Sequence, residues 1–167
     1  NDLLGLMHFE IGGYLVENVK PVVAFDVDKR KVGKDLSEAI FELPNCTTKF
    51  SNVGYLNAPV LMGNILDGFS PHMKNFPENK TFLLSDEEPV DIVQALERFE
   101  TDVVINYLPV GSNEATQFYA DAAIKADCAF INCIPSFIAS DLNWVKKFQY
   151  AGRPLIGDDI KSQLGAT

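Results

Sequence analysis

The side chains that could do chemistry stand where predicted strands end. In an open parallel sheet, ligands bind beyond the carboxyl ends of the strands, so position alone makes these residues candidates. They fall into four groups along the chain: Asp26 and Asp28; Pro109, Gly111 and Ser112; Asn132; and Asp158, Asp159 and Lys161.

Asp26 is the candidate for binding the ribose of a dinucleotide. An acidic residue that closes the second strand of a Rossmann sheet commonly accepts hydrogen bonds from the adenosine ribose and repels the extra phosphate of NADP. Asp26 fits better than Asp28 because it lies directly at the apolar end of the strand. The alternative is that Asp28 caps the next helix and Asp26 is a solvated turn residue, and the spacing supports both interpretations equally.

Two loops are candidates for the rest of such a site. Residues 108–112, Leu-Pro-Val-Gly-Ser, could pass beneath a dinucleotide, with Gly111 allowing close approach. The local pattern alone favours, by about two to one, a plain turn in which Ser112 caps the following helix. In residues 132–136, Asn132 could hydrogen-bond a nicotinamide or a substrate hydroxyl, or it could hold the loop in place.

Asp158, Asp159 and Lys161 suggest catalysis. Paired carboxylates can hold a metal or take a proton, and a neighbouring lysine can bind phosphate or polarise a carbonyl. The alternative, an acidic helix start with an exposed lysine, is equally compatible with the composition. Cys133 has no His or Asn partner at a recognisable spacing and is not predicted to be a nucleophile, and a lone loop histidine such as His72 is expected to make ordinary hydrogen bonds.

The elements that must position these residues alternate between strands and helices. The β-branched run at 103–105 predicts a strand covered on both faces, and residues 63–81 predict a long loop with a helical turn near residues 71–74. The pattern is typical of an α/β fold, a Rossmann-like doubly wound parallel sheet in one domain. Further strands are predicted at 19–27, 58–62, 128–134 and 154–156, and helices at 31–41, from a Ser85–Glu88 capping box to Phe99, from Ser112 to Ala126, and from Ser140 or Asp141 to Gly152.

Composition narrows the classes of protein. The 167 residues are 47% hydrophobic, enough for a globular core, and the net charge of −9 argues against a nucleic-acid or anionic-membrane surface. Three cysteines, two of them in predicted buried strands, indicate reduced thiols in a cytoplasmic protein. No apolar run is long enough to span a bilayer.

Six segments carry a specific resemblance: GLMHFEIGGY, VVAFDVDKRKVGKDLSEAIF, LDGFSPHM, INYLPVGSNEATQFYADAA, FINCIPSFIAS and GDDIKSQLGAT. In these segments, which cover nearly the whole chain in order, the sequence resembles the prokaryotic inositol-phosphate synthases. The resemblance implies an NAD-binding Rossmann domain of a homo-oligomeric enzyme, a tetramer in the family. It also implies isomerisation of glucose 6-phosphate to myo-inositol 1-phosphate by internal oxidation, aldol cyclisation and reduction, with a divalent or monovalent cation as a candidate second cofactor.

The resemblance also implies roles for individual residues. Asp26, with Asp28 beside it, would hold the adenosine ribose, and Pro109, Gly111 and Ser112 would run beside the dinucleotide. Asn132 and Asp158 would face the nicotinamide end, and Asp158 and Lys161 would be catalytic on the substrate side.

Two departures from the family pattern lead to a further expectation. No Gly-x-Gly-x-x-Gly turn precedes residues 19–27, and Gly12-Gly13 is not that motif. The family also continues past the last segment into a second domain. We therefore expect residues 1–167 to be a partial NAD-binding domain that lacks the first βα unit. The alternatives are a non-catalytic Rossmann-fold binding module and a general NAD-dependent sugar oxidoreductase.

Overall fold

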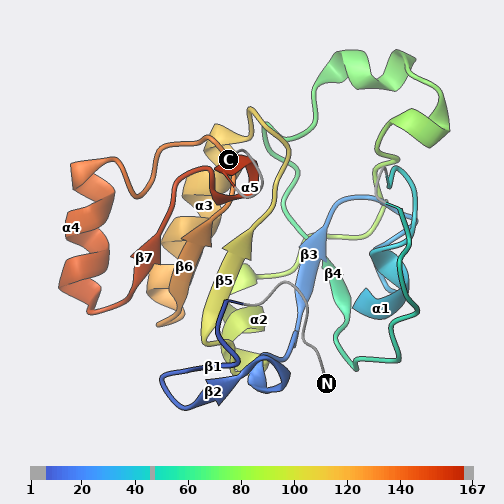
Figure 1. The fold of residues 1–167 in the computed structure, drawn as a ribbon. Coiled ribbons are helices and arrows are strands. Elements are labelled where there is room, and N and C mark those ends of the chain that lie inside the picture. The colour runs from blue at the N-terminus through green and yellow to red at the C-terminus, as the bar shows by residue number, and fades with distance from the viewer. Residues whose placement is uncertain (1–6, 46–47, 164–167) are drawn as a thin grey trace.

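The structure is a computed structural model that describes residues 7–45 and 48–163, without the side chains of Lys161 and Gln163. Its parallel strands form two runs, which lie side by side in Figure 1. The first run pairs β3 (Ala24–Asp26) with β4 (Val60–Met62), and the second contains β5 (Val103–Asn106), β6 (Ala129–Asn132) and β7 (Leu155–Ile156). A separate two-stranded hairpin consists of β1 (Glu10–Ile11) and β2 (Tyr14–Leu15).

The two runs have the strand order of a Rossmann sheet with one position empty. In the order 3-2-1-4-5-6, strands β4 and β3 match positions 3 and 2, and β5, β6 and β7 match positions 4, 5 and 6. No strand of the described residues occupies the position between β3 and β5. The expected α/β fold with a Rossmann-like parallel sheet is confirmed.

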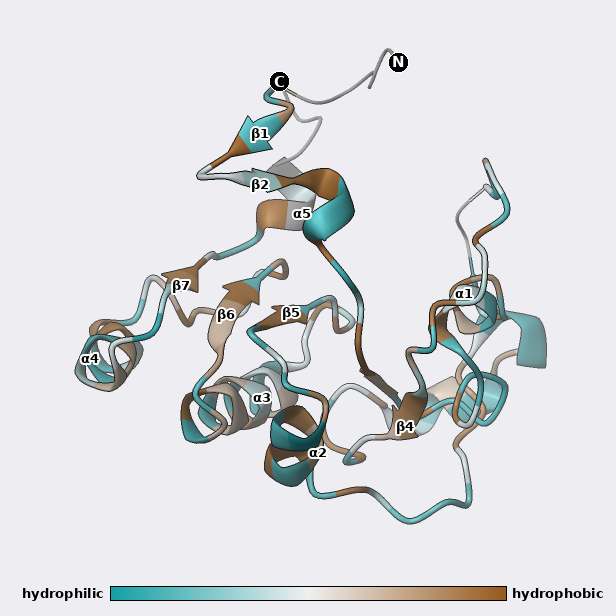
Figure 2. Ribbon diagram, turned by 90° about the horizontal axis from the view of Figure 1, so that it is seen from below, coloured by the Kyte–Doolittle hydropathy of each residue, from teal (hydrophilic) through white to brown (hydrophobic). Residues whose placement is uncertain are grey.

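The longer helices cover one face of the sheet. Figure 2 shows α2 (Ile92–Arg98), α3 (Asn113–Lys125) and α4 (Leu142–Ala151) on one side, and the hairpin with α5 (Ile160–Gln163) on the other. The core between these helices and the strands includes Leu96, Phe130 and Phe148, all nearly inaccessible to solvent. The remaining helices are α1 (Leu36–Ala39) and the 3-10 helices η1 (Val16–Asn18), η2 (Pro71–Asn75) and η3 (Glu78–Lys80). None of the described helices is long and apolar enough to cross a membrane.

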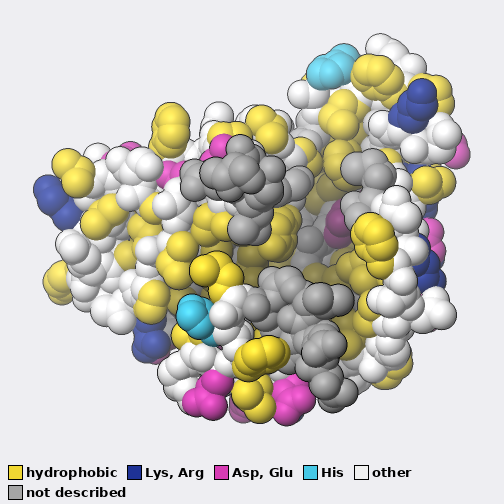
Figure 3. Space-filling model, in the orientation of Figure 1, with side chains coloured by type: hydrophobic (Ala, Val, Ile, Leu, Met, Phe, Trp, Pro, Cys, Tyr) yellow, Lys and Arg dark blue, Asp and Glu magenta, His cyan; other side chains and the backbone are white. Residues whose placement is uncertain are grey.

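The opposite face of the sheet carries exposed apolar side chains, so the prediction that strand 103–105 is covered on both faces is wrong. Val103 and Ile105 are 42% and 48% exposed, whereas Asn106 on the other face is buried. Figure 3 shows hydrophobic side chains gathered on this face. The β-branched run was sufficient to predict a strand, but burial depends on which other elements cover it.

Aromatic rings join the two runs of strands. Tyr119 of α3 packs its ring 5.9 Å from the ring of Phe25 in β3 and 5.3 Å from that of Phe118. A Cβ atom at Gly63, directly after β4, would lie 2.5 Å from the Tyr119 hydroxyl. Burial, together with the nearby charge of Asp26, raises the pKa of Tyr119 well above its usual range. Gly63 therefore allows the close contact between β4 and α3.

The observed helix ends match the predicted ones where the capping residues are followed by residues that permit a helix. The α4 prediction is confirmed, because Asp141 accepts from the backbone of Asn143 and Gly152 adopts the left-handed conformation at the C-cap. The Ser85–Glu88 capping box is wrong. Pro89 disfavours helical backbone at Glu88, so α2 begins at Ile92 with Asp91 as its cap.

The helix predicted over 31–41 is also much shorter in the structure. Gly33 has a positive φ of 83°, which a right-handed helix cannot include, and the chain becomes helical only after Asp35. The strand predicted over 19–27 is likewise reduced to β3.

Candidate functional site

Asp26 ends β3 with its two carboxylate oxygens in different surroundings. Oδ1 accepts hydrogen bonds from the backbone N–H groups of Val27 and Asp28, at 2.7 and 2.9 Å. Oδ2 lies 3.2 Å from the ammonium of Lys31, and both side chains remain partly accessible to solvent. One oxygen therefore fixes the orientation of the carboxylate, and the other pairs with Lys31 in a side chain that is 26% exposed.

Asp28, two residues on, is completely buried and has a structural environment. It forms two hydrogen bonds with the guanidinium of Arg30, at 2.8 and 2.5 Å, and accepts from the backbone N–H groups of Arg30 and Leu83. Burial would raise the pKa of Asp28, but these hydrogen bonds and the Arg30 charge outweigh it and lower the pKa. Asp28 therefore holds the turn that follows β3, in keeping with the preference for Asp26 as the ribose ligand.

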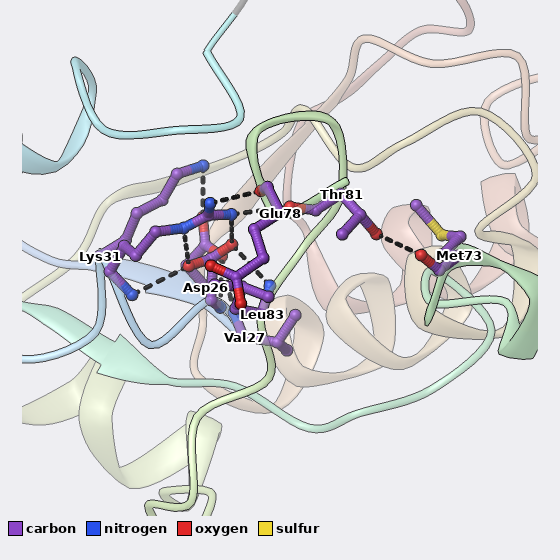
Figure 4. A network of polar contacts seen from close by, with 9 residues as sticks. Asp26, Val27, Lys31, Met73, Glu78, Thr81 and Leu83 are labelled. Atoms are coloured by element: carbon purple, nitrogen blue, oxygen red, sulfur yellow. Dashed lines mark hydrogen bonds and ion pairs between the residues drawn. The ribbon is translucent and has the colours of Figure 1, made fainter. Parts of the chain in front are cut away.

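Arg30 extends this network to a segment far along the chain. Its guanidinium donates to the carbonyl oxygens of Glu78 and Thr81, and the Thr81 hydroxyl donates to the carbonyl of Met73 (Figure 4). Segment 67–81 lies within the loop predicted over 63–81 and contains η2 at the predicted helical turn; these bonds tie it to the end of β3.

A second anchor ties segment 67–81 to helix α3. The carboxylate of Asp67 accepts from the backbone N–H groups of Glu114 and Ala115, at 2.7 and 2.9 Å. Asp67 supplies the cap that the sequence assigned to Ser112, so that assignment is wrong. The Ser112 hydroxyl is buried and donates to the carbonyl of Pro109.

A cavity of about 330 Å³ lies between segment 67–81 and the loop 109–111, beside the predicted cofactor loop. Its lining includes Met73, Phe76 and Gly111. A larger cavity of about 590 Å³ is lined by residues 19–22, 56–57 and 98–100, which precede β3, β4 and β5. Because ligands of parallel sheets bind at the carboxyl ends, the smaller cavity is the better candidate.

The carboxyl ends of β5, β6 and β7 are linked by a buried polar chain. The Asn106 amide donates to the Thr116 hydroxyl and to Asn132 Oδ1, at 3.1 and 2.9 Å. The Asn132 amide in turn donates to the Ser136 carbonyl and to Asp158 Oδ1, at 2.5 and 2.7 Å. Asn132 is fully buried, and its amide holds the loop 132–136, which matches one of the two interpretations of this residue.

Asp158 binds the loop between β6 and α4. Its carboxylate accepts from the backbone N–H groups of Ile138, Ala139 and Ser140, at 3.0 to 3.1 Å. Burial would raise the pKa of Asp158, but these bonds and that from Asn132 outweigh it and lower the pKa. A carboxylate in these surroundings stays ionised and is suited to positioning a loop, and a catalytic role for Asp158 stays a prediction.

Of the side chains that the structure describes, those of the other candidate residues are not part of this hydrogen-bonded chain. Asp159 accepts from the Ser162 hydroxyl, and Lys161 lies in α5 with its side chain outside the described part of the chain. Cys133 is a free, buried thiol, and His72 packs edge-on against Phe76. Among the described residues, no group of three or more His, Cys, Asp or Glu side chains could hold a metal ion.

The residues present fit the adenosine half of an NAD molecule. Asp26 offers a partly exposed carboxylate at the position of the second Rossmann strand's end, where a ribose hydroxyl would donate. Gly111 has a positive φ, and a Cβ atom there would meet nothing within 4 Å, so its backbone borders open space. The sequence predicted Asp26 and this loop as site residues, which stays a prediction, and it did not point to Arg30, Asp67 or Asn106, which have partners distant in sequence.

Comparison with known proteins shows which proteins this chain resembles. No family model matches the chain. The chain is 54% identical to the inositol-3-phosphate synthase of Mycobacterium tuberculosis and 52% identical to that of Corynebacterium glutamicum, in each case over 163 residues. These matches cover 98% of this chain and 43% and 44% of the relatives. This chain is a homologue of the inositol-3-phosphate synthases.

The inositol-3-phosphate synthase resemblance seen in the six segments is thus confirmed over the length that matches. A solved structure, the crystal structure of Ari2, superposes with a TM-score of 0.75 at 30% sequence identity. The superposition covers 95% of this chain and 43% of Ari2. The chain therefore spans less than half the length of the proteins it resembles.

Proposed function

We propose that this chain forms the adenosine-binding part of the NAD site of an inositol-3-phosphate synthase. The enzyme would be an isomerase of inositol biosynthesis that converts glucose 6-phosphate to myo-inositol 1-phosphate. The identity of 52–54% to synthases over 98% of the chain supports the reaction. The observation that carries the cofactor site is the Asp26 carboxylate, which is fixed by two backbone N–H groups and accessible at the end of β3.

Each group of polar residues has a distinct task in this proposal. When bound, NAD would accept a hydride from the sugar and return it after ring closure. Asp26 binds the ribose, and the backbone at Gly111 runs beside the dinucleotide. Asn132 and Asp158 hold the loops that border the nicotinamide end, through the hydrogen bonds to Ser136 and to residues 138–140.

The remaining features of the proposal concern the whole protein. We place Lys161 on the substrate side, where its ammonium would attract the sugar phosphate. A divalent or monovalent cation, a homo-oligomeric state and a cytoplasmic location complete the expected properties of the enzyme.

The experiment is an assay of the full-length protein with glucose 6-phosphate and NAD, following both inositol phosphate and NADH. A synthase forms inositol phosphate with no net NADH, because the hydride returns to the product. Net NADH that rises with sugar consumption would instead identify an NAD-dependent sugar oxidoreductase. NAD binding without any turnover would identify a non-catalytic binding module.

A further inference from the structure

We infer that the turn after β3 contains a latent site for the 2′-phosphate of NADP, in which Lys31 supplies the cation once the charge of Asp26 is removed. The inference rests on the proposed dinucleotide site at Asp26. It goes further because it assigns a specificity role to a residue that the ribose interaction does not itself require.

The Lys31 ammonium lies beside the Asp26 carboxylate. It lies 3.2 Å from Asp26 Oδ2, the oxygen that the two backbone N–H groups leave to other partners (Figure 4). The side chains of Lys31 and Asp26 are 20% and 26% exposed, so solvent and a ligand can reach both. A group bound at Asp26 therefore lies within reach of Lys31.

The neighbouring cation, Arg30, is not available to bind a phosphate. Arg30 donates to both carboxylate oxygens of Asp28 and to the carbonyl oxygens of Glu78 and Thr81. Moving it would break these bonds and leave the buried Asp28 carboxylate without its counter-charge, which is costly. Lys34, in the same turn, pairs with Glu42 at 2.5 Å.

The two coenzymes, NAD and NADP, differ by a 2′-phosphate on the adenosine ribose. An Asp at this position accepts from the 2′-hydroxyl and repels the phosphate, whereas a nearby cation accommodates it. This turn holds both groups, with the cation neutralised by the anion. Removing the carboxylate charge would release Lys31 to bind the phosphate, since an ammonium on a flexible stem is an effective point charge for phosphate.

The test compares NAD and NADP affinities by titration calorimetry on the full-length protein, in wild type, Asp26→Ser and Asp26→Ser/Lys31→Ala. Asp26→Ser should weaken NAD binding and strengthen NADP binding, each by about tenfold or more. Adding Lys31→Ala should abolish the gain for NADP while leaving NAD affinity at the value of the single variant.

Two further variants keep the test clear. Asp26→Asn retains an acceptor oxygen for the backbone N–H groups of Val27 and Asp28, so it should fold and still bind NADP more tightly than wild type. Lys29→Ala removes a charge from the same turn at an exposed side chain and should leave both affinities unchanged.

The outcomes separate the two proposals. A wild type that binds NAD, with Asp26 variants that gain nothing for NADP or keep the gain without Lys31, would overturn the role of Lys31 alone. A wild type that binds neither coenzyme would overturn the proposed NAD site itself.

Discussion

The turn after β3 and the carboxyl ends of β5, β6 and β7 both gather polar side chains at the same edge of the fold, but they bond differently. Asp26 and Lys31 form a partly accessible ion pair, beside a pair in which Asp28 is fully buried and Arg30 is not. The second region is a buried chain of amides that ends at Asp158, whose oxygens accept from a loop. In the proposed function, the β3 turn therefore meets the ligand and the other region holds the loops around it.

The largest effect on stability is expected from Asp28, the buried carboxylate of the turn after β3. Asp28→Ala leaves Arg30 and the Leu83 N–H without their partner, and it should lower the free energy of unfolding by about 3–5 kcal/mol. Chemical denaturation would measure the change, with Lys29→Ala as the exposed control within about 0.5 kcal/mol of wild type. A loss below about 1 kcal/mol would show that the network does not stabilise this turn.

Asp158→Ala tests the second region. Loss of the acceptor for three backbone N–H groups should lower the free energy of unfolding by about 2–3 kcal/mol and expose the loop 138–140 to proteolysis. Asp159→Asn, which tolerates the positive φ at that position, is the neighbouring control. If Asp158→Ala were as stable as wild type but lost turnover, the carboxylate would act in the chemistry rather than on the loop.

Gly63→Ala tests the contact between β4 and α3, which joins the two runs of strands. The added methyl group would lie 2.5 Å from the Tyr119 hydroxyl, whose ring is held by Phe25 and Phe118, and should cost about 1–2 kcal/mol. Removing the hydroxyl with Tyr119→Phe in the same chain should restore part of the loss. Gly54→Ala, where a Cβ atom meets nothing within 4 Å, should be close to neutral in the same thermal unfolding measurement.

The smallest effect is an acid dependence that both regions share. Because the folded-state pKa values of Asp28 and Asp158 are lowered from 3.8, their contribution to stability is complete above that value. It is lost as the pH falls below about 4 and through the lower folded-state values. Denaturation at about pH 7, 5 and 3 should show the fall only in the last step, and Asp158→Asn should make it shallower. An equal fall in Asp158→Asn and wild type would contradict a lowered pKa at this carboxylate.

The sequence predicted those helix ends that are determined by residues close to them in the chain. Asp141 and Gly152 delimit α4 because both caps act within one turn of the helix. Ser85 and Glu88 have the same kind of signal, but Pro89 overrides it one residue later. Local capping patterns are thus reliable only when the residues that follow permit a helix.

The parts of the site that sequence reasoning missed depend on distant partners. Asp67 caps α3 from 47 residues earlier in the chain, and Arg30 binds the carbonyl of Thr81 across 51 residues. No periodicity or spacing reports such pairs, because the fold brings the residues together. Asp26 could be predicted as a ribose ligand because that prediction needs only its place at the end of one strand.

The most direct test of the proposed NAD site is to measure the NAD affinity of the full-length Asp26→Ala and Asp158→Ala variants, each checked for folding. Asp26→Ala should weaken NAD binding by about 1–3 kcal/mol, because the ribose hydroxyl loses its acceptor, while Asp158→Ala should act mainly on stability. NAD affinity that is unchanged by Asp26→Ala would remove Asp26 from the site and contradict the division between a ligand-binding β3 turn and a loop-holding second region.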